Sequence, residues 1–260
     1  MAETHSNKAD YGNWVPKRIL LLLLLIALVF TGIAFSPVPV IARFVVMFVA
    51  GPFWLGFLYL GYAYLVFSAN GGNLQSRIRG MVLANLPWNG RGKALDIGTG
   101  GGALAIRLAK KYAGAKVTGI DYWGICYDYS QKMCEDNAAI EGVGERIDFK
   151  KASAASLPFE NEVFDAIVSN FAFHHVRDAK DKRDVLREGF RVLRKGGVFC
   201  LQDFFFKEEL YGSQEELLEF ICGCGIEEVH FSRLGDLVRV PLLLRLRWIR
   251  VWSGMIHGKK

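Results

Sequence analysis

Two long apolar stretches dominate the first quarter of the chain. Residues 19–36 and 44–67 carry no charged side chain, and Arg43 is the one charged residue between positions 19 and 67. A helix of eighteen residues rises about 27 Å, close to the ~30 Å thickness of the hydrocarbon core of a bilayer. The stretches are separated by Ser-Pro-Val-Pro at residues 36–39, which favours a tight turn. The pattern predicts a tail over residues 1–16 and a transmembrane helical hairpin over residues 17–67.

Basic residues flank the predicted hairpin and give its orientation. They are Lys17 and Arg18 before it and Arg77, Arg79, Arg91 and Lys93 after it. Because basic residues collect on the cytoplasmic side of a membrane, both ends of the hairpin are expected in the cytoplasm. We therefore predict an integral protein of the cell membrane whose globular part is cytoplasmic.

Two other interpretations of these stretches stay open. The first stretch follows basic residues and also fits a signal peptide, although the second stretch would then be unexplained. The second stretch contains Gly51-Pro52, Gly56 and Gly61, which weaken a straight helix. It therefore also fits a re-entrant or interfacial segment.

From residue 93 onward, short apolar runs alternate with amphipathic stretches. The runs predict strands at 94–97, 117–120, 147–150, 164–169, 198–202 and 226–231, and the stretches predict helices at 103–112, 127–137, 182–193 and 214–222. Such alternation predicts an α/β domain, over residues 93–236, with a parallel sheet covered on both faces. Residues 68–92 are expected to form a linker with a short helix at 74–85.

The C-terminal segment, residues 237–260, has a mixed pattern. Between positions 238 and 252 leucines, tryptophans and arginines are interspersed. One interpretation is the last strand of the sheet followed by a tail. The other is a basic amphipathic segment that lies on the inner leaflet of the membrane.

Composition narrows the possible partners. The chain is 52% hydrophobic with a net charge of +6, and its basic residues lie near apolar segments, which favours a lipid bilayer over nucleic acid. Its five cysteines have no regular spacing and do not indicate a disulfide framework. The pair in Cys222-Gly223-Cys224 has no second pair to complete a metal site, so no metal is predicted.

A glycine-rich turn follows the first predicted strand of the α/β domain. It reads Leu95-Asp96-Ile97-Gly98-Thr99-Gly100-Gly101-Gly102, where glycines permit a tight turn and a close approach of a ligand to the backbone. The spacing is neither the G-x-G-x-x-G of dinucleotide sites nor a P-loop. Asp121 ends the second strand, where a carboxylate can accept hydrogen bonds from both hydroxyls of a ribose.

Five motifs in this order resemble the class I S-adenosylmethionine (SAM) dependent methyltransferases, particularly the branch with ubiquinone/menaquinone and sterol methyltransferases. The resemblance covers about residues 93–204. After the glycine turn its signs are Gly119-Ile120-Asp121, Leu157-Pro158-Phe159, residues 164–170 with Phe173-His174-His175, and Arg191-Val192-Leu193-Arg194-Lys195-Gly196-Gly197. The resemblance implies a Rossmann-like, seven-stranded domain with SAM as the cofactor. The apolar hairpin is not part of that shared fold.

The resemblance also implies roles for individual residues. Those expected around the methionine part of SAM are Asp96, Gly98, Thr99, Gly100 and Gly102. Asp121 would hold the ribose, with Tyr122 beside the adenine, and Asn170 would face the sulfonium. Where the family often has an acid for the adenine amino group, this chain has Ser153-Ala154, so that contact is expected to be a weaker hydroxyl or backbone one.

Candidates for the chemistry follow the fourth and fifth strands. Methyl transfer needs an aligned nucleophile and, in some reactions, a base that removes a proton. His174, His175 and Asp203 are the predicted catalytic residues, with Tyr211 as a further candidate, because histidine titrates near neutral pH. The alternative is that the two histidines only pack or cap a loop. Trp123, Cys126, Tyr127 and Tyr129 are expected to pack near the cofactor.

These expectations together predict a membrane-anchored methyltransferase of a small, hydrophobic acceptor such as a quinone, lipid or thiol. Two alternatives stay open. In the first, the hairpin is only an anchor for an enzyme with a soluble substrate. In the second, the domain is a SAM-binding sensor without turnover.

Overall fold

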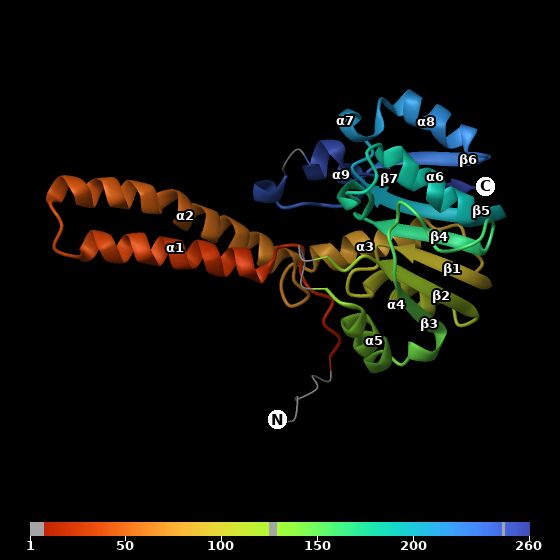
Figure 1. Cartoon of the computed structure of the whole chain (residues 1–260), viewed down its shortest axis with the longest axis horizontal. Coiled ribbons are helices and arrows are strands. Elements are labelled where there is room, and N and C mark those ends of the chain that lie inside the picture. The colour runs from red at the N-terminus through yellow and green to blue at the C-terminus, as the bar shows by residue number, and fades with distance from the viewer. Residues whose placement is uncertain (1–7, 125–128, 246–247) are drawn as a thin grey trace. The chain divides into compact units, whose positions relative to one another are not determined.

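The computed structural model describes residues 8–124, 129–245 and 248–260, which form two compact units (Figure 1). One unit comprises residues 13–76. The other contains residues 77–260 together with the segment before residue 13. The division between the units falls within helix α3 (Leu74–Asn85), which occupies the short helix predicted for the linker. Each unit is treated by itself below.

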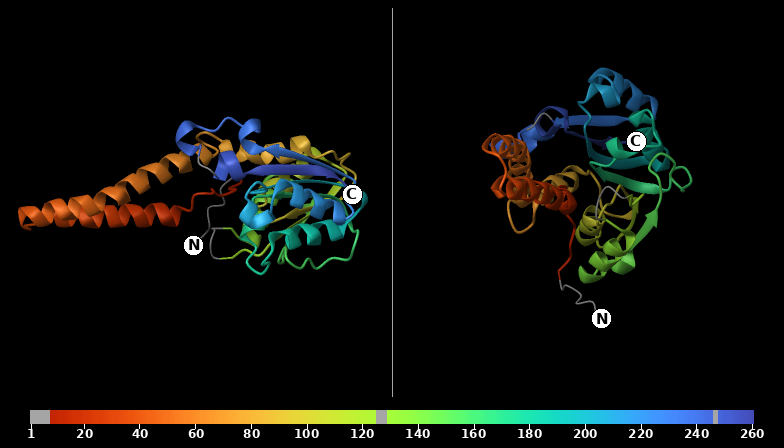
Figure 2. Two further views of the ribbon diagram at one scale, coloured as in Figure 1. Left: turned by 90° about the horizontal axis from the view of Figure 1, so that it is seen from above. Right: turned by 60° about the vertical axis from the view of Figure 1, so that its left-hand side comes forward.

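The first unit is a pair of helices, α1 (Lys17–Phe35) and α2 (Val40–Phe67), which run side by side (Figure 2). Both predicted helices are therefore present, and Pro52 lies within α2 without ending it. Apart from Phe67, the buried positions of the two helices are alanines: Ala27, Ala34, Ala50 and Ala63 are at most 4% exposed. Small residues let two helices approach closely, as at helix contacts in membranes. The indole Nε1 of Trp54 donates to Thr31 Oγ1 at 3.0 Å across this contact.

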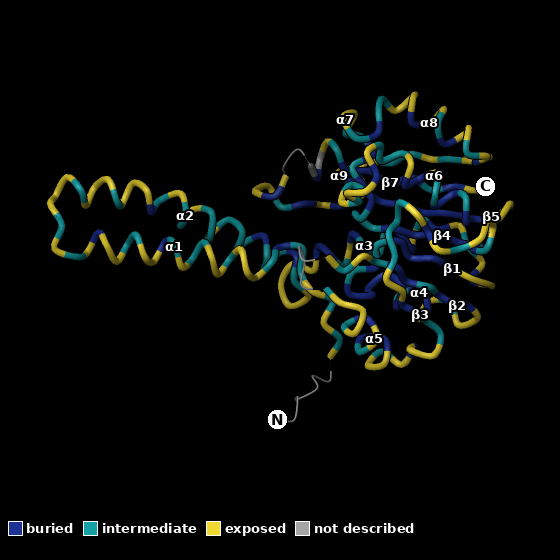
Figure 3. The backbone as a smooth tube through the Cα atoms, viewed as in Figure 1, coloured by how far each residue is buried: buried dark blue, intermediate teal, exposed yellow. Residues whose placement is uncertain are grey.

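The remaining faces of the two helices are apolar and exposed (Figure 3). Leu21 is 65% exposed and Phe48 is 83% exposed. Both helices are long and apolar enough to cross a membrane. The pair thus buries only a narrow seam of its apolar surface within its own unit.

The second unit contains a seven-stranded sheet in the order β3-β2-β1-β4-β5-β7-β6. The strands are β1 (Gly92–Ile97), β2 (Ala115–Asp121), β3 (Ile147–Lys151), β4 (Phe164–Asn170), β5 (Leu193–Asp203), β6 (Glu228–Arg233) and β7 (Gly254–Lys259). β3, β2, β1, β4 and β5 pair in parallel, but β7 is antiparallel to both β5 and β6. The expected Rossmann-like, seven-stranded arrangement is confirmed, and the prediction of an entirely parallel sheet is wrong at β7.

The reversal at β7 has a topological reason. The connection after β6 stays at the edge where that strand ends, so the next strand starts there and runs back. The last strand lies within residues 237–260, where one of the two interpretations of that segment has it, but it follows the stretch of leucines, tryptophans and arginines at 238–252. The strand begins at Gly254, and η3 (Leu242–Leu244) and the π-helical turn η4 (Trp248–Trp252) precede it.

Helices cover both faces of the sheet, as predicted. Residues of α3, α4 (Ala103–Lys111) and α5 (Gln131–Ile140) share one buried cluster with Ala94, Ala166 and Val168 of the strands. Residues of α6 (Lys182–Val192), α7 (Glu208–Tyr211) and α8 (Gln214–Gly223) share the other with Leu95 and Ile167. Successive strand residues thus alternate between the two faces. The unit also contains three short helical turns: η1 (Gly144–Arg146), η2 (Phe173–His175) and α9 (Leu234–Leu237).

Several helix boundaries differ from the predictions by one to four residues, and those of α5 and α6 have a local reason. α5 begins after Ser130, whose hydroxyl accepts a hydrogen bond from Met133 N at 3.1 Å and caps the helix. Residues 127 and 128 of the predicted helix lie outside the described residues. α6 ends at Val192. The residues Arg194-Lys195-Gly196-Gly197 that follow belong to the start of β5 and do not form a C-terminal cap of the helix.

Candidate functional site

The glycine turn joins β1 to α4 at the edge of the sheet where the parallel strands end. Gly98, Gly100 and Gly102 all have positive φ, at 77°, 58° and 82°. A Cβ on Gly98 would lie 2.1 Å from Cβ of Ala172, so a larger residue would clash as well as strain the backbone. The turn therefore needs glycine for both its shape and its close packing.

Asp96 lies beneath this turn and is 1% exposed. Its Oδ2 accepts hydrogen bonds from Thr99 Oγ1 at 2.7 Å and from Ala105 N at 3.0 Å. Its Oδ1 is buried without a hydrogen-bond partner among the described residues. Burial raises the pKa of this carboxyl from 3.8 to about 7, against the two hydrogen bonds, which lower it. A buried carboxyl oxygen without a hydrogen-bond partner is suited to bind a cationic group of a ligand.

Asp121 ends β2 and fastens the glycine turn. Its Oδ2 accepts from Gly100 N and its Oδ1 from Trp123 N, both at 2.9 Å. The indole Nε1 of Trp123 in turn donates to the Gly100 carbonyl at 2.9 Å. Each carboxylate oxygen can accept a further hydrogen bond, so these contacts leave room for ribose hydroxyls.

Aromatic residues after Asp121 take different positions. Tyr122 is 66% exposed, and the ammonium nitrogen of Lys151 lies 5.4 Å from the centroid of its ring. Trp123 packs against the buried cluster of α4 and α5. A Cβ on Gly100 would lie 3.5 Å from the ring of Tyr129, which therefore borders the turn. Cys126 and Tyr127 lie outside the described residues.

The structure brings an acid to the place where the sequence has none. The hydroxyl of Ser153 donates to Asp178 Oδ2, and its oxygen accepts from Ala155 N at 3.1 Å. Asp178 lies 25 residues further along the chain, between η2 and α6, so no local motif could have identified it. Ala154 packs against the buried cluster below α6.

The predicted catalytic residues meet at the ends of β4 and β5. Asp203 is 1% exposed, and its Oδ1 lies 2.8 Å from His174 Nδ1. The carboxylate also accepts from three backbone N–H groups: Phe173 at 2.9 Å, His174 at 3.3 Å and Phe204 at 2.7 Å. Asp203 is thus buried behind the histidine.

The two histidines are not equivalent. His174 stacks near Phe204, with ring centroids 4.2 Å apart, and its side chain is 13% exposed. The centroid of His175 lies 4.0 Å from that of His174. The pKa of His175 is lowered to about 4, first because protein atoms displace water from the ring and second because His174 is adjacent, although part of its surface remains exposed. The Asp203 carboxylate at its Nδ1 orients the ring of His174, so His174 is the better placed of the two to act as a base.

Two further residues complete this end of the sheet. Asn170 ends β4, and its Oδ1 is buried without a hydrogen-bond partner among the described residues. Tyr211 is fully buried, with its ring 5.0 Å from that of Phe205. Burial and the charge of Asp203 raise the pKa of Tyr211, so this hydroxyl stays protonated. Tyr211 is thus a core residue in this structure, and a role for it in the chemistry stays a prediction.

An N-terminal segment also contacts the glycine turn, which the sequence analysis did not foresee. Asn137 of α5 is 3% exposed, and its Nδ2 donates to Gly101 O at 2.9 Å and to Asp10 O at 2.7 Å. Its Oδ1 accepts from Asp10 N at 2.9 Å. The hydroxyl of Tyr11 donates to Glu141 at 3.0 Å. Residues 10 and 11 therefore form a strap on the outside of the turn.

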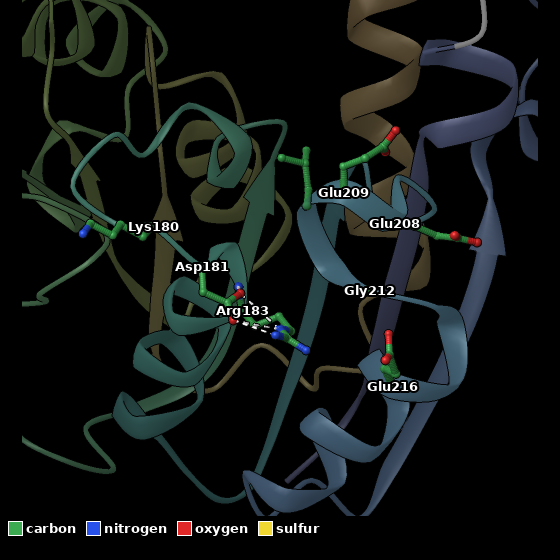
Figure 4. Close-up of a pocket in the computed structure, with 8 residues that line it drawn as sticks. Lys180, Asp181, Arg183, Glu208, Glu209, Gly212 and Glu216 are labelled. Carbon is green, nitrogen blue, oxygen red and sulfur yellow. Dashed lines mark hydrogen bonds and ion pairs between the residues drawn. The ribbon is translucent and has the colours of Figure 1, made fainter.

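A separate hollow of about 490 Å³ lies between the start of α6 and helices α7 and α8 (Figure 4). Its lining residues are Lys180, Asp181, Arg183, Glu208, Glu209, Leu210, Gly212 and Glu216. Arg183 binds Asp181 within it, at 2.8 Å for the shortest contact. None of the residues predicted to hold the cofactor lines this hollow, whose lining has four acidic and two basic side chains. Among the described residues, no group of three or more His, Cys, Asp or Glu side chains could hold a metal ion.

The comparison with known proteins identifies the domain. Residues 95–201 match the family described as "Methyltransferase domain". The chain is 35% identical over 126 residues to the ubiquinone/menaquinone biosynthesis C-methyltransferase UbiE of Desulfotalea psychrophila, which covers 48% of this chain and 47% of the relative. It is 36% identical over 134 residues to the 27-O-demethylrifamycin SV methyltransferase of Amycolatopsis mediterranei, covering 50% and 44%. The chain therefore spans less than half the length of these two relatives.

Solved structures agree on the fold. The geranyl diphosphate C-methyltransferase of Streptomyces coelicolor, solved with S-adenosyl-L-homocysteine, superposes with a TM-score of 0.56 at 13% identity, covering 72% of this chain and 80% of that one. The glycine turn, the two carboxylates and the sheet order of this chain agree with that family and its cofactor. Residues 95–201 thus form a domain that is similar to the methyltransferase domain family and has the fold of a solved SAM-dependent methyltransferase.

Proposed function

We propose that this protein transfers the methyl group of SAM to a hydrophobic acceptor that is dissolved in a membrane, such as a quinone, a lipid or an apolar thiol. The observation that carries the proposal is that the chain with the cofactor turn also has two helices whose exposed surface is apolar. Leu21 and Phe48, at 65% and 83% exposed, are typical of it. Exposed apolar patches of this extent are rare on soluble proteins and mark contact with lipid or protein.

The residues around the glycine turn fit the cofactor. Asp96 Oδ1 and Asn170 Oδ1 are buried acceptors without a partner among the described residues. They suit the ammonium group and the sulfonium side of SAM. Asp121 would accept from the ribose, and Ser153 with Asp178 would meet the adenine amino group. When bound, SAM supplies an electrophilic methyl group on a sulfonium.

His174 is the residue that we expect to accept a proton from the acceptor. The Asp203 carboxylate accepts hydrogen bonds at both oxygens, so the nitrogen that faces it, Nδ1, is the protonated one. This arrangement fixes the tautomer and leaves Nε2 as the basic nitrogen. The negative charge of Asp203 also stabilises the imidazolium that forms. Asp203 therefore positions His174 and does not itself touch the acceptor.

The apolar helices support an anchor that brings the enzyme to its acceptor. Lys17 and Arg18 precede α1, and the basic residues near the start of the catalytic unit follow α2. By the positive-inside rule both ends of the pair lie in the cytoplasm, where SAM is made. Two spanning helices that meet along a small-residue seam would expose their remaining apolar surface to lipid. The acceptor then approaches by diffusion within the membrane.

The test is a partition experiment with the full chain in nanodiscs. The protein is incubated with methyl-tritiated SAM and a lipid extract of its native host, and the products are divided between organic and aqueous phases. Transfer into the organic phase, abolished in Asp121→Ala and strongly reduced in His174→Gln, is the expected result. Transfer into aqueous products would instead support a soluble acceptor with the helices as an anchor. Tight SAM binding without transfer would support a sensor.

A further inference from the structure

The connection between β6 and β7 stands at the same edge of the sheet as the histidine and its carboxylate. β6 ends at Arg233, and β7 begins at Gly254 directly opposite it. Gly254 also pairs with Asp203 at the end of β5. Residues 234–253 therefore leave the sheet and return to it beside the Asp203–His174 pair.

This connection is firmly attached to the segment that follows Asp203. Phe206 N donates to Trp252 O at 3.0 Å, and the ammonium of Lys207 lies 4.8 Å from the centroid of the Trp252 ring. On the other strand, the guanidinium of Arg233 lies 4.0 Å from the ring of Phe206. These contacts tie both ends of the connection to the loop next to the active site.

Within the connection, residues 237–245 have one buried and one exposed side, and we call this segment the docking finger. Val238, Val240 and Leu244 are at most 7% exposed and fix its inner side. On its outer side Leu237, Leu242 and Leu243 are 41%, 77% and 63% exposed. The finger is thus held in place from within, and the leucines at its tip are not needed to hold it there.

Charge distinguishes the finger from a core segment that happens to be uncovered. Arg239 and Arg245 are exposed on either side of the leucine tip, and the segment contains no acidic residue. Apolar side chains beside arginines suit the interface of an anionic bilayer, where leucines enter the acyl boundary and guanidinium groups meet phosphates. A bilayer is also the partner that accounts for the apolar surface of α1 and α2.

We infer that the docking finger inserts Leu242 and Leu243 into the surface of an anionic membrane and so holds the Asp203–His174 edge of the sheet against it. The inference rests on the membrane part of the proposed function, but not on the identity of the acceptor. Its consequence is a catalytic domain with one fixed face toward the lipid, rather than a domain that tumbles on a tether. A hydrophobic acceptor would then pass from the bilayer to His174 without crossing water.

The test measures how deeply single positions of the full chain lie in nanodiscs of phosphatidylcholine with phosphatidylglycerol. In a Cys222→Ser background, which removes an exposed thiol, an environment-sensitive fluorophore is attached to Leu242→Cys, Lys195→Cys or Leu21→Cys. Lys195 is the matched control, because it is exposed at the opposite end of β5, the strand that ends at Asp203. Leu21→Cys reports on the α1 anchor. Quenching by brominated lipid and by aqueous iodide is recorded for each.

We expect lipid quenching at positions 242 and 21 to be several-fold stronger than at position 195. The double variant Arg239→Glu/Arg245→Glu should lose lipid quenching at position 242 and keep it at position 21. The wild-type finger in nanodiscs of phosphatidylcholine alone should give the same result. Strong quenching at 21 with equal, weak quenching at 242 and 195 would overturn the finger and leave the anchor intact. No quenching at 21 would overturn the anchor and the finger together. Shielding of position 242 from iodide without lipid quenching would overturn the inference in favour of a protein partner or a second copy.

Discussion

The buried carboxyl of Asp96 is expected to lose a proton when SAM binds. In the free protein burial raises its pKa from 3.8 to about 7, and its Oδ1 has no partner among the described residues. An ammonium group of the cofactor beside that oxygen would stabilise the ionised form and lower the pKa again. Cofactor binding and proton release are therefore coupled through this one residue.

The size of the effect follows from the pKa. A carboxyl with a pKa of about 7 is about 90% protonated at pH 6 and about 10% protonated at pH 8. SAM binding should therefore release about 0.9 proton per site at pH 6 and about 0.1 proton at pH 8. Below neutrality, the affinity for SAM should rise almost tenfold for each unit by which the pH increases.

The same residue makes folding stability depend on pH. The carboxyl has a higher pKa in the folded protein than in the unfolded chain, so its protonated form favours folding. That contribution is complete below pH 3.8 and is lost as the pH rises through about 7. The difference between 3.8 and about 7 corresponds to roughly 4 kcal/mol in the free energy of unfolding.

Calorimetric titration of SAM in buffers with different ionisation enthalpies counts the protons. Asp96→Asn is the control: it should bind SAM more weakly, release no proton from this site, and have a flatter dependence of unfolding on pH between 4 and 8. Hydrogen exchange of the β1 amides, corrected for intrinsic rates, measures the stability. Equal proton release at pH 6 and pH 8 in the wild type, or unchanged release in Asp96→Asn, would refute the reasoning.

Three further substitutions probe other parts of the site. Asp203→Asn should present an amide to His174 and favour the wrong tautomer, which lowers kcat by about 10²–10³ and leaves the KM for SAM unchanged. Steady-state kinetics measure both constants, and a normal kcat would show that His174 is not the base. Asn137→Leu removes three hydrogen bonds to Asp10 and Gly101, which should weaken SAM binding roughly tenfold and expose the strap to protease; unchanged cleavage would contradict this role. Gly98→Ala should destabilise the domain by about 2–4 kcal/mol, measured by hydrogen exchange, because its φ is +77° and Ala172 occupies the space; wild-type protection would show that the turn can rearrange.

The parts of this protein that were predictable depend on local pattern. Long charge-free stretches gave α1 and α2, because a helix in that composition needs no information from elsewhere in the chain. The glycine turn with Asp96, and Asp121 at the end of β2, follow from alternating strands and helices. In a parallel sheet the carboxyl ends of the strands meet at one edge, so these residues were expected to be neighbours.

The parts that were not predictable depend on contacts between distant positions. Asp178 reaches Ser153, and Asn137 joins Asp10 to Gly101, across separations that no periodicity encodes. The different roles of His174 and His175 also depend on burial and on Asp203, not on sequence spacing. The bounds of β7 were not predictable because its Gly254, His257 and Gly258 break the alternation of a strand. The backbone of β7 pairs with β5 on one side and β6 on the other, and this pairing stabilises the strand in place of favourable side chains.

The most direct test of the central claim is the stoichiometry of SAM bound by the full chain in nanodiscs, measured by equilibrium dialysis with labelled cofactor. The account predicts one SAM per chain in the wild type and in His174→Gln, and a loss of at least about tenfold in affinity in Asp121→Ala, because Asp121 holds the glycine turn and is the proposed acceptor for the ribose hydroxyls. Absence of binding in the wild type, or binding that Asp121→Ala leaves unchanged, would contradict the assignment of the cofactor to this edge of the sheet.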